Sequence, residues 1–454
     1  MKLSKMAIIA AIACGMHAGN AFGQQVKNNI QQVACADCDC GQPVCGCEAP
    51  AEEGCDNASS CAGGCDSACG CDSASGCGLG SCLDKMACSE LGDPWTLFKT
   101  KPLGFTIGGW SDVGYHSSNN AGSGILFAGG APANFNNYDS NVQLQQQWLY
   151  AERIADGSSG FGLGGRVDYL YGTDAKDTQA FGIANKHWDN SWDNGNVTAG
   201  YGNAMPQLYG EVAYGKTAVK IGHFFTIIGS EVVQGTGNFF YSRQFTFYNS
   251  IPFTHTGAQA THVINDETTI YGGYVMGWDS GFEDNGDAYI GGIKRQVTEG
   301  FTALYTTALG RFNDDPASTN ARERGQIQNL IFTTAMSDKL TNIVQLDYLD
   351  THDEAGNRVR KSTGINTYFI YRVSDRVALG SRAEYYNWST GGGVPTPVNG
   401  SELFNQTFGV NYRAHANLLL RPEVRWINDI DRHGVNENFA KQKTIFGMDA
   451  IFTF

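Results

Sequence analysis

Apolar and polar side chains alternate along most of the chain after residue 94, and this period of two constrains the fold more than any other feature. In the segment 418–426, leucine, proline, valine and tryptophan alternate with arginine and glutamate. The segments 344–348, 365–373 and 377–386 repeat the pattern. Such alternation is typical of β-strands whose two faces meet different surroundings. Residues 94–454 are therefore predicted to be all-β.

The connections between the expected strands alternate in length. Short turns are expected near 155–160, 215, 265–266, 298–300, 337–338, 374–375 and 415–416. Long connections are expected over 117–142, 172–205, 226–254, 278–285, 312–325, 350–362, 388–402 and 427–443. This alternation predicts a transmembrane antiparallel β-barrel of about 16 strands, because such barrels carry short turns on one rim and long loops on the other. A soluble sandwich or propeller has no reason to sort its loops in this way.

The composition excludes several other classes of protein. Charged residues make up only 17% of the chain and glycines number 58, which is unlike a typical cytosolic enzyme. After the first residues, no apolar run approaches the roughly 18 residues that a transmembrane helix needs. Acidic and basic side chains are mixed over 94–454 without the basic surface that binds nucleic acid. No nucleic-acid partner is therefore expected.

The last residues of the chain support a barrel in lipid. Phe446, Met448, Ala450, Phe452 and Phe454 form one apolar face of a final strand. In a soluble protein, an edge strand this apolar would invite aggregation. We expect Phe452 and Phe454 to form the terminal signal that the barrel-assembly machinery reads.

Residues 1–23 have the pattern of a secretory signal peptide. Lys2 and Lys5 precede an apolar stretch, and Ala21 and Gly23 place small residues at the −3 and −1 positions of a cleavage site. The protein is therefore expected to be exported. In a competing interpretation, Cys14 is the lipid-modified residue of a lipoprotein, although the apolar stretch before it would then be very short.

Residues 24–93 form a cysteine-rich, low-complexity segment. Every cysteine except Cys14 lies here, among Gly, Ala, Ser and Asp, with almost no large apolar residues to build a core, so disorder is expected. The C-x-x-C and C-x-C spacings suit either disulfides or a thiolate metal site. Disulfides are favoured in an exported protein, and we expect no cofactor and no assured metal. The candidate residues are Cys35, Cys38, Cys40, Cys45, Cys47, Cys69 and Cys71.

A closed barrel turns the polar face of its strands toward a lumen. Closure is required because lipid offers no hydrogen-bond partners to unpaired backbone groups. A barrel of this size encloses water, and a wall with charges of both signs lets hydrated solutes pass without holding them tightly. The candidate pore-lining or constriction residues are Arg166, Asp168, Glu211, Lys220, Glu231, Arg243, Gln345, Asp347, Arg376, Arg382, Glu384, Arg421, Glu423 and Arg425.

The third long connection, 226–254, is too apolar for a loop that extends into water, since isoleucine, valine and phenylalanine recur along it. We expect it to fold into the lumen and narrow it. Glu231 and Arg243 would then lie at the constriction and face arginines of the wall. The alternative is a loop that packs on the rim or at a subunit contact.

The sequence contains no convincing catalytic motif. Gly160, Gly162 and Gly165 spell G-x-G-x-x-G, but they precede a strand and do not link a strand to a helix. Neither G-x-S-x-G nor H-E-x-x-H occurs. His223 and His255, at the ends of the third long connection, are the remaining candidates for a base, and we expect structural roles for them. The protein is not expected to be an enzyme.

Several ordered segments resemble one family of outer-membrane proteins. They are GRVDYLYGTDA (165–175), VKIGHFFTIIGSEV (219–232), FFYSRQFTFY (239–248), IPFTHTG (251–257) and GGYVMGWD (272–279). These segments resemble the OmpL-like β-barrel porins, and the resemblance covers about residues 103–454. It implies an outer-membrane barrel that acts as a diffusion channel. The cysteine-rich segment lies outside it.

The sequence therefore predicts an outer-membrane porin for passive diffusion of small hydrophilic solutes or ions. Its expected partners are outer-membrane lipid, the barrel-assembly machinery, the solutes themselves and further copies of the chain, with a trimer the usual arrangement of such channels. The alternative is a structural barrel that links the outer membrane to the cell wall or to neighbours through the cysteine-rich arm.

Overall fold

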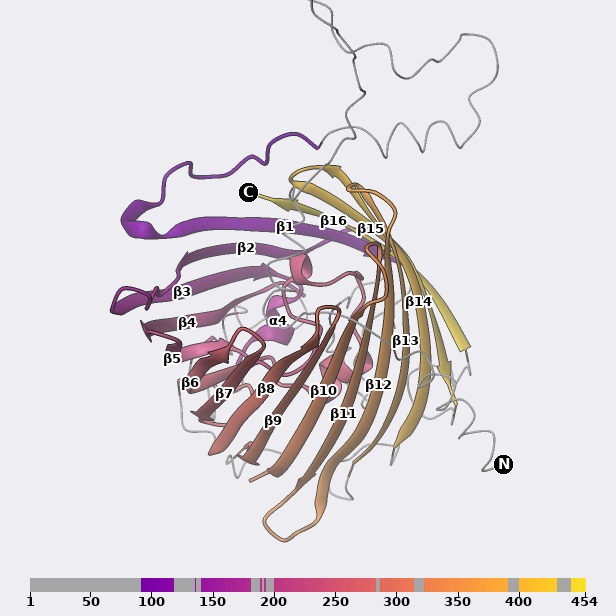
Figure 1. Cartoon of the computed structure of the whole chain (residues 1–454). Helices are drawn as coiled ribbons and strands as arrows, with labels where there is room; N and C mark the ends of the chain where they lie inside the picture. The colour runs from indigo at the N-terminus through magenta and orange to yellow at the C-terminus, as the bar shows by residue number, and fades with distance from the viewer. Residues whose placement is uncertain are drawn as a thin grey trace, which may run out of the picture.

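The computed structural model describes residues 91–117, 135, 140–180, 188–189, 192, 200–282, 286–313, 322–390, 400–430 and 442–454. The described part of the chain forms a closed barrel in which each strand pairs antiparallel with its sequence neighbours and β1 pairs with β16 (Figure 1). The strands are β1 (Thr106–His116), β2 (Gln143–Arg153), β3 (Phe161–Gly172), β4 (Gly202–Tyr214), β5 (Thr217–Phe225), β6 (Thr254–Asn265), β7 (Thr268–Val275), β8 (Ala288–Thr298), β9 (Phe301–Arg311), β10 (Arg324–Ala335), β11 (Leu340–His352), β12 (Arg358–Arg372), β13 (Val377–Thr390), β14 (Ser401–His415), β15 (Leu418–Asp429) and β16 (Gln442–Thr453). The prediction of a 16-strand transmembrane barrel is confirmed.

The connections also follow the predicted alternation. The turns at 154–160, 215–216, 266–267, 299–300, 336–339, 373–376 and 416–417 form the short-turn rim. One predicted long connection is wrong. We expected a loop over 350–362, but β11 and β12 continue their pairing from Leu349 with Ser362 to His352 with Arg358, and only residues 353–357 remain between them. Strand pairing satisfies backbone hydrogen bonds that a loop would leave open. The two strands therefore continue into the polar residues that the sequence assigned to the loop.

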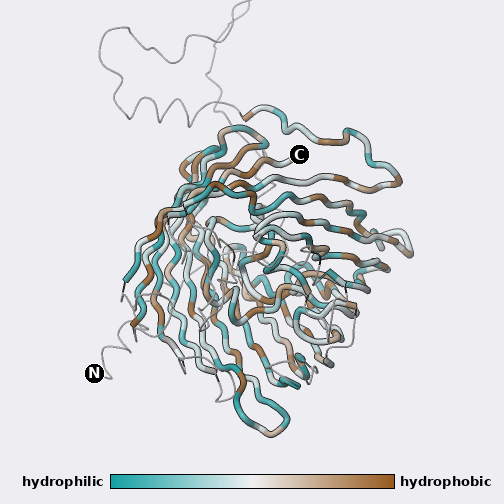
Figure 2. Tube along the Cα trace, turned by 180° about the vertical axis from the view of Figure 1, so that it is seen from behind, coloured by the Kyte–Doolittle hydropathy of each residue, from teal (hydrophilic) through white to brown (hydrophobic). Residues whose placement is uncertain are grey.

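The alternation of side chains places apolar groups outside and polar groups inside. On β16, Phe446, Met448 and Phe452 are exposed on the outer face, whereas Asp449 is 1% exposed in the lumen. On β13, Leu379 is exposed and Arg382 is fully buried. Figure 2 shows brown and teal residues alternating along the strands. The outer surface is therefore suited to lipid, and the inner surface is polar.

Strand β2 fits neither face in the sequence because it contains an irregularity. Its pairing with β1 shifts between Asp112 and Val113, which pair with Gln146 and Leu144 and leave Gln145 unopposed. A bulge of this kind reverses the inward and outward assignment on its two sides. Gln143, Gln145 and Gln146 are consequently all buried.

The start of the described chain is attached to the short-turn rim at the seam of the barrel. The backbone N–H of Trp95 donates to Asn417 Oδ1 at 2.6 Å, and Asn417 Nδ2 donates to the Trp95 carbonyl at 2.7 Å. The Trp95 ring stacks on Phe452 with 6.3 Å between ring centroids. Phe454 exchanges backbone hydrogen bonds with Gly109 of β1 and so extends the pairing that closes the barrel.

The third long connection, residues 226–253, is called the inward loop below. It carries the 3₁₀ turn η2 (Gly235–Gly237) and the short helix α5 (Phe245–Ser250), and its backbone lies inside the barrel (Figure 1). Side chains of several strands form hydrogen bonds with it. A second short helix, α4 (Ala175–Thr178), follows β3 and contacts β4. Within the described residues, no helix is long and apolar enough to cross a membrane.

Candidate functional site: the lumen and its inward loop

The inward loop is apolar because most of its side chains are packed against the inside of the barrel. The contacts surround the loop, with one apolar group on β1–β4, one on β7–β11 and one on β13–β16. Burying such side chains removes apolar area from water and fixes the loop in place. The loop residues in these groups are Val233, Phe247 and Phe253 in the first, Ile228 and Ile251 in the second, and Phe245 in the third. The predicted inward fold is thus present in the structure.

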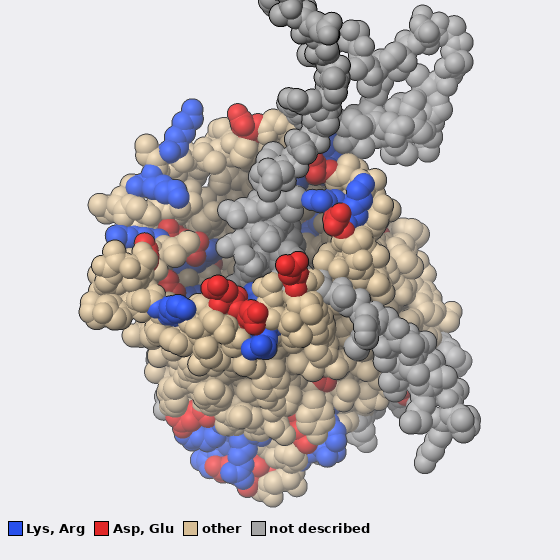
Figure 3. Space-filling view, viewed as in Figure 1, with Lys and Arg blue, Asp and Glu red and all other residues tan. Residues whose placement is uncertain are grey.

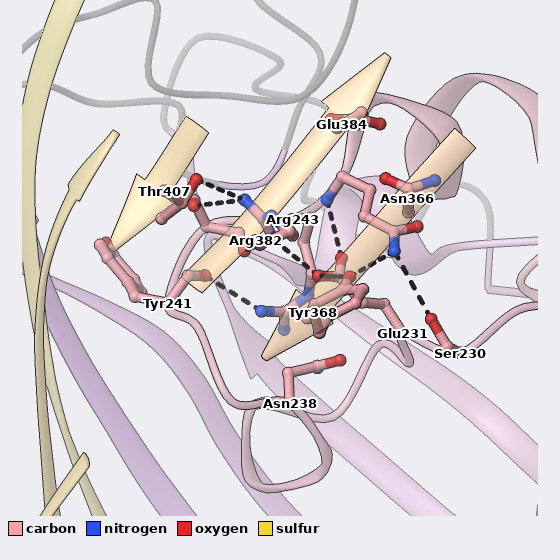
Figure 4. A network of polar contacts seen from close by, with 12 residues as sticks. Ser230, Glu231, Asn238, Tyr241, Arg243, Asn366, Tyr368, Arg382, Glu384 and Thr407 are labelled. Carbon is pink, nitrogen blue, oxygen red and sulfur yellow. Dashed lines mark hydrogen bonds and ion pairs between the residues drawn. The ribbon is translucent and has the colours of Figure 1, made fainter. Parts of the chain in front are cut away.

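A buried ion pair joins the loop to the wall. Glu231 of the loop lies against Arg382 of β13, with 2.6 Å between Oε1 and Nη1, and their side chains are 5% and 0% exposed. Figure 4 shows Tyr368 of β12 beside this pair; its hydroxyl donates to Glu231 Oε1 at 2.8 Å. Gln244 closes the other side, because its backbone N–H donates to Glu231 Oε2 at 2.7 Å. Each buried charge therefore has several partners, as a buried charge requires.

Two wall carboxylates hold the backbone of the loop. Glu384 accepts hydrogen bonds from the backbone N–H groups of Phe245 at 3.0 Å and Thr246 at 2.8 Å. Glu423 accepts from Tyr241 at 3.0 Å and Ser242 at 3.2 Å. These N–H groups have no strand to pair with, and a charged acceptor satisfies them more strongly than a neutral one.

Two wall arginines complete this side of the attachment. Arg421 of β15 donates to the loop carbonyls of Gly235 at 2.8 Å and Asn238 at 2.7 Å, and it is paired with Asp449 of β16. Arg425 lies over the ring of Phe245, with 4.7 Å from Cζ to the ring centroid. A cation above an aromatic face is attracted by the ring quadrupole.

The predicted pair Gln345 and Asp347 on β11 also serves the loop. Gln345 Oε1 accepts from the backbone N–H of Ser230 at 2.9 Å, and its amide donates to Asp347 at 2.8 Å. Asn329 of β10 donates to Asp347 at 2.6 Å and accepts from the backbone N–H of Gly229 at 3.2 Å. These residues therefore face the lumen, where the root of the loop covers them.

Arg243 is buried within the loop. Its guanidinium donates to the carbonyls of Tyr241 at 3.0 Å and Val233 at 2.9 Å, and it is 3% exposed. Glu231 likewise forms its ion pair with Arg382. Both side chains therefore hold the loop in place, and neither extends freely across an aperture. The expected contact of Glu231 with a wall arginine is present.

The wall charges on β2–β5 are arranged differently. Arg166 of β3 bridges Asp168 at 2.9 Å and Glu152 at 3.2 Å, and its side chain is 17% exposed. Glu211 and Lys220 occupy paired positions on β4 and β5. A cavity of about 1300 Å³, including its open part, lies between this wall and the loop. It is lined by Trp110, Tyr150, Glu152, Arg166, Gln207, Tyr209, Glu211, Lys220, Phe225, Val232, Gln234 and Thr236, among others.

Arg376 lies outside this arrangement, which corrects its place among the pore-lining candidates. It ends the turn 373–376, and its guanidinium donates to the carbonyls of Arg413 at 3.2 Å and Ala414 at 2.9 Å. The period-two pattern of β13 continues into the turn in the sequence, and this continuation made Arg376 look like a residue of the inner wall.

The structure adds polar lumen residues that the sequence reasoning missed. Glu152 and Asp112 lie on strands whose period is interrupted by the bulge at Gln145, so their side was not assigned. Asp449 alternates with the apolar residues of the last strand, yet its role depends on pairing directly with Arg421, which only the register shows. Tyr150 and Tyr209 lie beneath Arg166 and Lys220 at 4.7 and 4.8 Å.

Buried carboxyl groups fasten the long connections next to the loop. Asp279 accepts from the backbone N–H groups of Phe253 at 2.5 Å and Thr254 at 2.9 Å, and burial raises its pKa to about 7. Asp189 accepts from the backbone of Ala180 and Met205, and burial raises its pKa to about 7 as well. Desolvation penalises the charged form of each group.

His223 and His255 have structural partners. His223 Nδ1 lies 2.8 Å from Thr256 Oγ1. His255 lies 3.1 Å from Thr226 Oγ1 and 3.2 Å from the Gly277 carbonyl. Among the described residues, no group of three or more His, Cys, Asp or Glu side chains could hold a metal ion. Cys35, Cys38, Cys40, Cys45, Cys47, Cys69 and Cys71 lie outside the described residues.

One comparison with known proteins shows the family of the chain. A family model described as "Putative beta-barrel porin-2, OmpL-like" matches residues 104–454. No curated protein matches the sequence. Among solved structures, an OmpT variant of Vibrio cholerae lacking loop L8 is similar with a TM-score of 0.49 and 12% identity, covering 77% of this chain and 99% of that one. An anion-selective porin from Comamonas acidovorans has a TM-score of 0.49 and 11% identity, over 77% and 99% of the two chains. The channel DcaP of Acinetobacter baumannii has a TM-score of 0.48 and 9% identity, over 79% and 100%.

Proposed function

Because this chain belongs to the OmpL-like β-barrel porin family and is thus an outer-membrane porin, we propose that small hydrophilic solutes and ions diffuse passively through its lumen. The observation that carries the proposal is the charged, partly open wall on β2–β5. Arg166, Glu211 and Lys220 face the cavity between wall and loop, whereas Val212 and Ile221, beside the last two, are exposed on the outside. The charged side chains therefore face a water-filled space inside the barrel, and the apolar side chains face lipid outside it.

The inward loop sets the size limit in this proposal. Its attachment to β13 and β15 removes that side of the lumen from use, because Arg382, Glu384, Arg421 and Glu423 are all engaged by loop groups. Solutes then pass on the β2–β6 side. Figure 3 shows a hollow in the barrel with basic and acidic side chains along its edge. A wall with charges of both signs favours passage without tight binding.

Recording from the purified full chain in a planar bilayer tests the proposal. Stepwise conductance with a linear relation between current and voltage is expected for a wet, passive channel. A second readout is the swelling of liposomes in sugars of increasing size, which should cease above one size. If the reconstituted protein conducted no current and let no sugar pass, the diffusion function would be refuted.

A second function is favoured by the attachment of Trp95. Its hydrogen bonds to Asn417 place the start of the described chain on the short-turn rim, which faces the periplasm in outer-membrane barrels. The cysteine-rich segment precedes Trp95 in the chain, so a structural role through this arm is our alternative. Gel mobility of the full chain with and without reductant distinguishes the two, because a cross-linking arm produces multimers that reductant dissolves.

Assembly and partners complete the proposal. We expect outer-membrane lipid around the exposed apolar face, recognition of Phe452 and Phe454 by the barrel-assembly machinery, and a homotrimer. The chain is proposed to have no catalytic role, since His223 and His255 are engaged by threonine hydroxyl groups. Chemical cross-linking of the membrane-inserted chain tests the subunit number.

A further inference from the structure

One part of the inner wall is apolar, although it faces the lumen. Tyr271 of β7, Leu304 of β9 and Ile331 of β10 form a buried group with Ile343 of β11 and Ile227 of the loop. They line a second cavity of about 1100 Å³, including its open part. Packing of the loop accounts for Ile227 and for Ile343, which also contacts the group of Phe239 and Phe240, but a cavity remains in front of Tyr271, Leu304 and Ile331.

The apolar cavity joins the charged cavity described above. Gln207, Lys220, Phe225, Val232 and Gly237 line both cavities, so Lys220 stands at their junction. A molecule held there would touch aliphatic and aromatic side chains on one side and charged groups on the other. Such a surface is amphipathic, unlike the uniformly polar wall that diffusion alone requires.

The charged groups at this junction have opposite signs and lie on neighbouring strands, close enough to attract each other but without an ion-pair contact within 4.0 Å among the described residues. Lys220 Nζ lies over the ring of Tyr209, 4.8 Å from its centroid, and no carboxylate of the described residues lies within 4.0 Å of it. Glu211 is its cross-strand partner, but its Oε2 accepts a long hydrogen bond of 3.4 Å from the backbone of Ala155, in the turn 154–160. The two charges therefore lie on neighbouring strands and are directed toward different neighbours.

The other charges nearby are already paired. Arg166 is held between Asp168 and Glu152, which leaves the ammonium of Lys220 and the carboxylate of Glu211 as the ionic groups of the cavity without an ion-pair partner among the described residues. One cation, one anion and an apolar surface together complement a molecule that carries the same three features. A simple anion or a simple cation would leave one of the two charges unmatched.

We propose that the junction of the two cavities is a binding site for a small zwitterion with an apolar side chain, of the class of aliphatic amino acids and short apolar peptides. Its carboxylate pairs with Lys220, its ammonium with Glu211, and its apolar group lies against Leu304, Ile331 and Tyr271. This inference rests on the proposed diffusion function, because a weak site in the narrow part of a channel favours one solute among many.

Equilibrium binding of radiolabelled L-leucine to the full chain in detergent tests the site, with conductance in a bilayer measured separately. We expect saturable binding of leucine. Two analogues that each lack one charge, 4-methylpentanoate and isopentylamine, should compete with the labelled leucine at least tenfold more weakly than unlabelled leucine does. The K220M, E211Q and L304N variants should each weaken leucine binding at least tenfold. K294M, which removes another lysine of the membrane strands outside both cavities, should bind leucine as the wild type does.

The outcomes separate the site from the channel. Conductance without saturable leucine binding would overturn the site and leave the diffusion function in place. Saturable leucine binding without conductance would support the site and overturn the diffusion function. Equal competition by 4-methylpentanoate would show an anion site and refute the zwitterion, and equal competition by isopentylamine would show a cation site. The heat-modifiable gel mobility of each variant verifies that its barrel has folded.

Discussion

The buried pair of Arg382 and Glu231 should control how firmly the inward loop is held. Replacing Arg382 by methionine keeps the length of the side chain but removes the cation, and Glu231 is then a buried charge with only Tyr368 and Gln244 to compensate it. Breaking a buried ion pair from one side costs about 3–5 kcal/mol. Since about 1.4 kcal/mol is a factor of ten, the population of detached loops should rise by roughly two to nearly four orders of magnitude.

Limited proteolysis of the inserted protein measures this population, and single-channel conductance measures its effect. R382M should be cleaved within 226–253 much faster than the wild type and should show larger or noisier conductance. The double variant E231Q/R382M should recover much of the loss, because no unpaired charge remains. The control is R295M, whose partner Glu267 lies 3.4 Å away with both side chains more than half exposed, so a change below about 1 kcal/mol is expected. Equal effects of R295M and R382M would refute the reasoning.

Three further predictions follow from named contacts. Burial raises the pKa of Asp279 to about 7, so its contribution to the free energy of unfolding is greatest in acid and is lost as the pH rises through 7. Heat-modified gel mobility from pH 5 to 8 should show this loss in the wild type and not in D279N. Ser230 and Gln345 lie in hydrogen-bond contact, so a disulfide in the S230C/Q345C variant should protect the loop from proteolysis, and reductant should restore cleavage. Equal cleavage of the oxidised and reduced variant would contradict the docked loop. Removing Phe454 deletes two backbone hydrogen bonds with Gly109 at the barrel seam and the proposed assembly signal, so the heat-modifiable fraction in membranes should fall severalfold, and an unchanged fraction would argue against both roles.

Much of the barrel could be predicted from the sequence because the physics of lipid acts on every second residue. The faces of β13, β15 and β16 followed directly, since Arg382 and Arg421 are buried and Phe446 and Phe452 are exposed where the pattern placed them. The alternation failed where local hydrogen bonding overrode it. The bulge at Gln145 obscured β2, and continued strand pairing shortened the connection after β11 to 353–357.

The candidate site was less predictable because polar residues that look alike in the sequence have different roles on the inner wall. Arg382 and Arg166 have the same pattern in the sequence, yet Arg382 bonds to the inward loop and Arg166 lines the cavity. Which one a solute can reach depends on where the loop lies, and the loop position follows from contacts between residues more than a hundred positions apart. The apolar lumen group of Tyr271, Leu304 and Ile331 could not be distinguished from ordinary core residues for the same reason.

The central claim is that alternate residues of one strand meet water and lipid, and adjacent positions on β5 test it most directly. Lys220 lines both cavities, and Ile221 is 60% exposed on the outer face. Cysteine is introduced at each position in the full chain, which has no native cysteine after Cys88, and bilayer current is recorded while a charged, water-soluble thiol reagent is added. The current of K220C should change relative to the treated wild type, and that of I221C should not. A response of I221C with none from K220C would contradict the account.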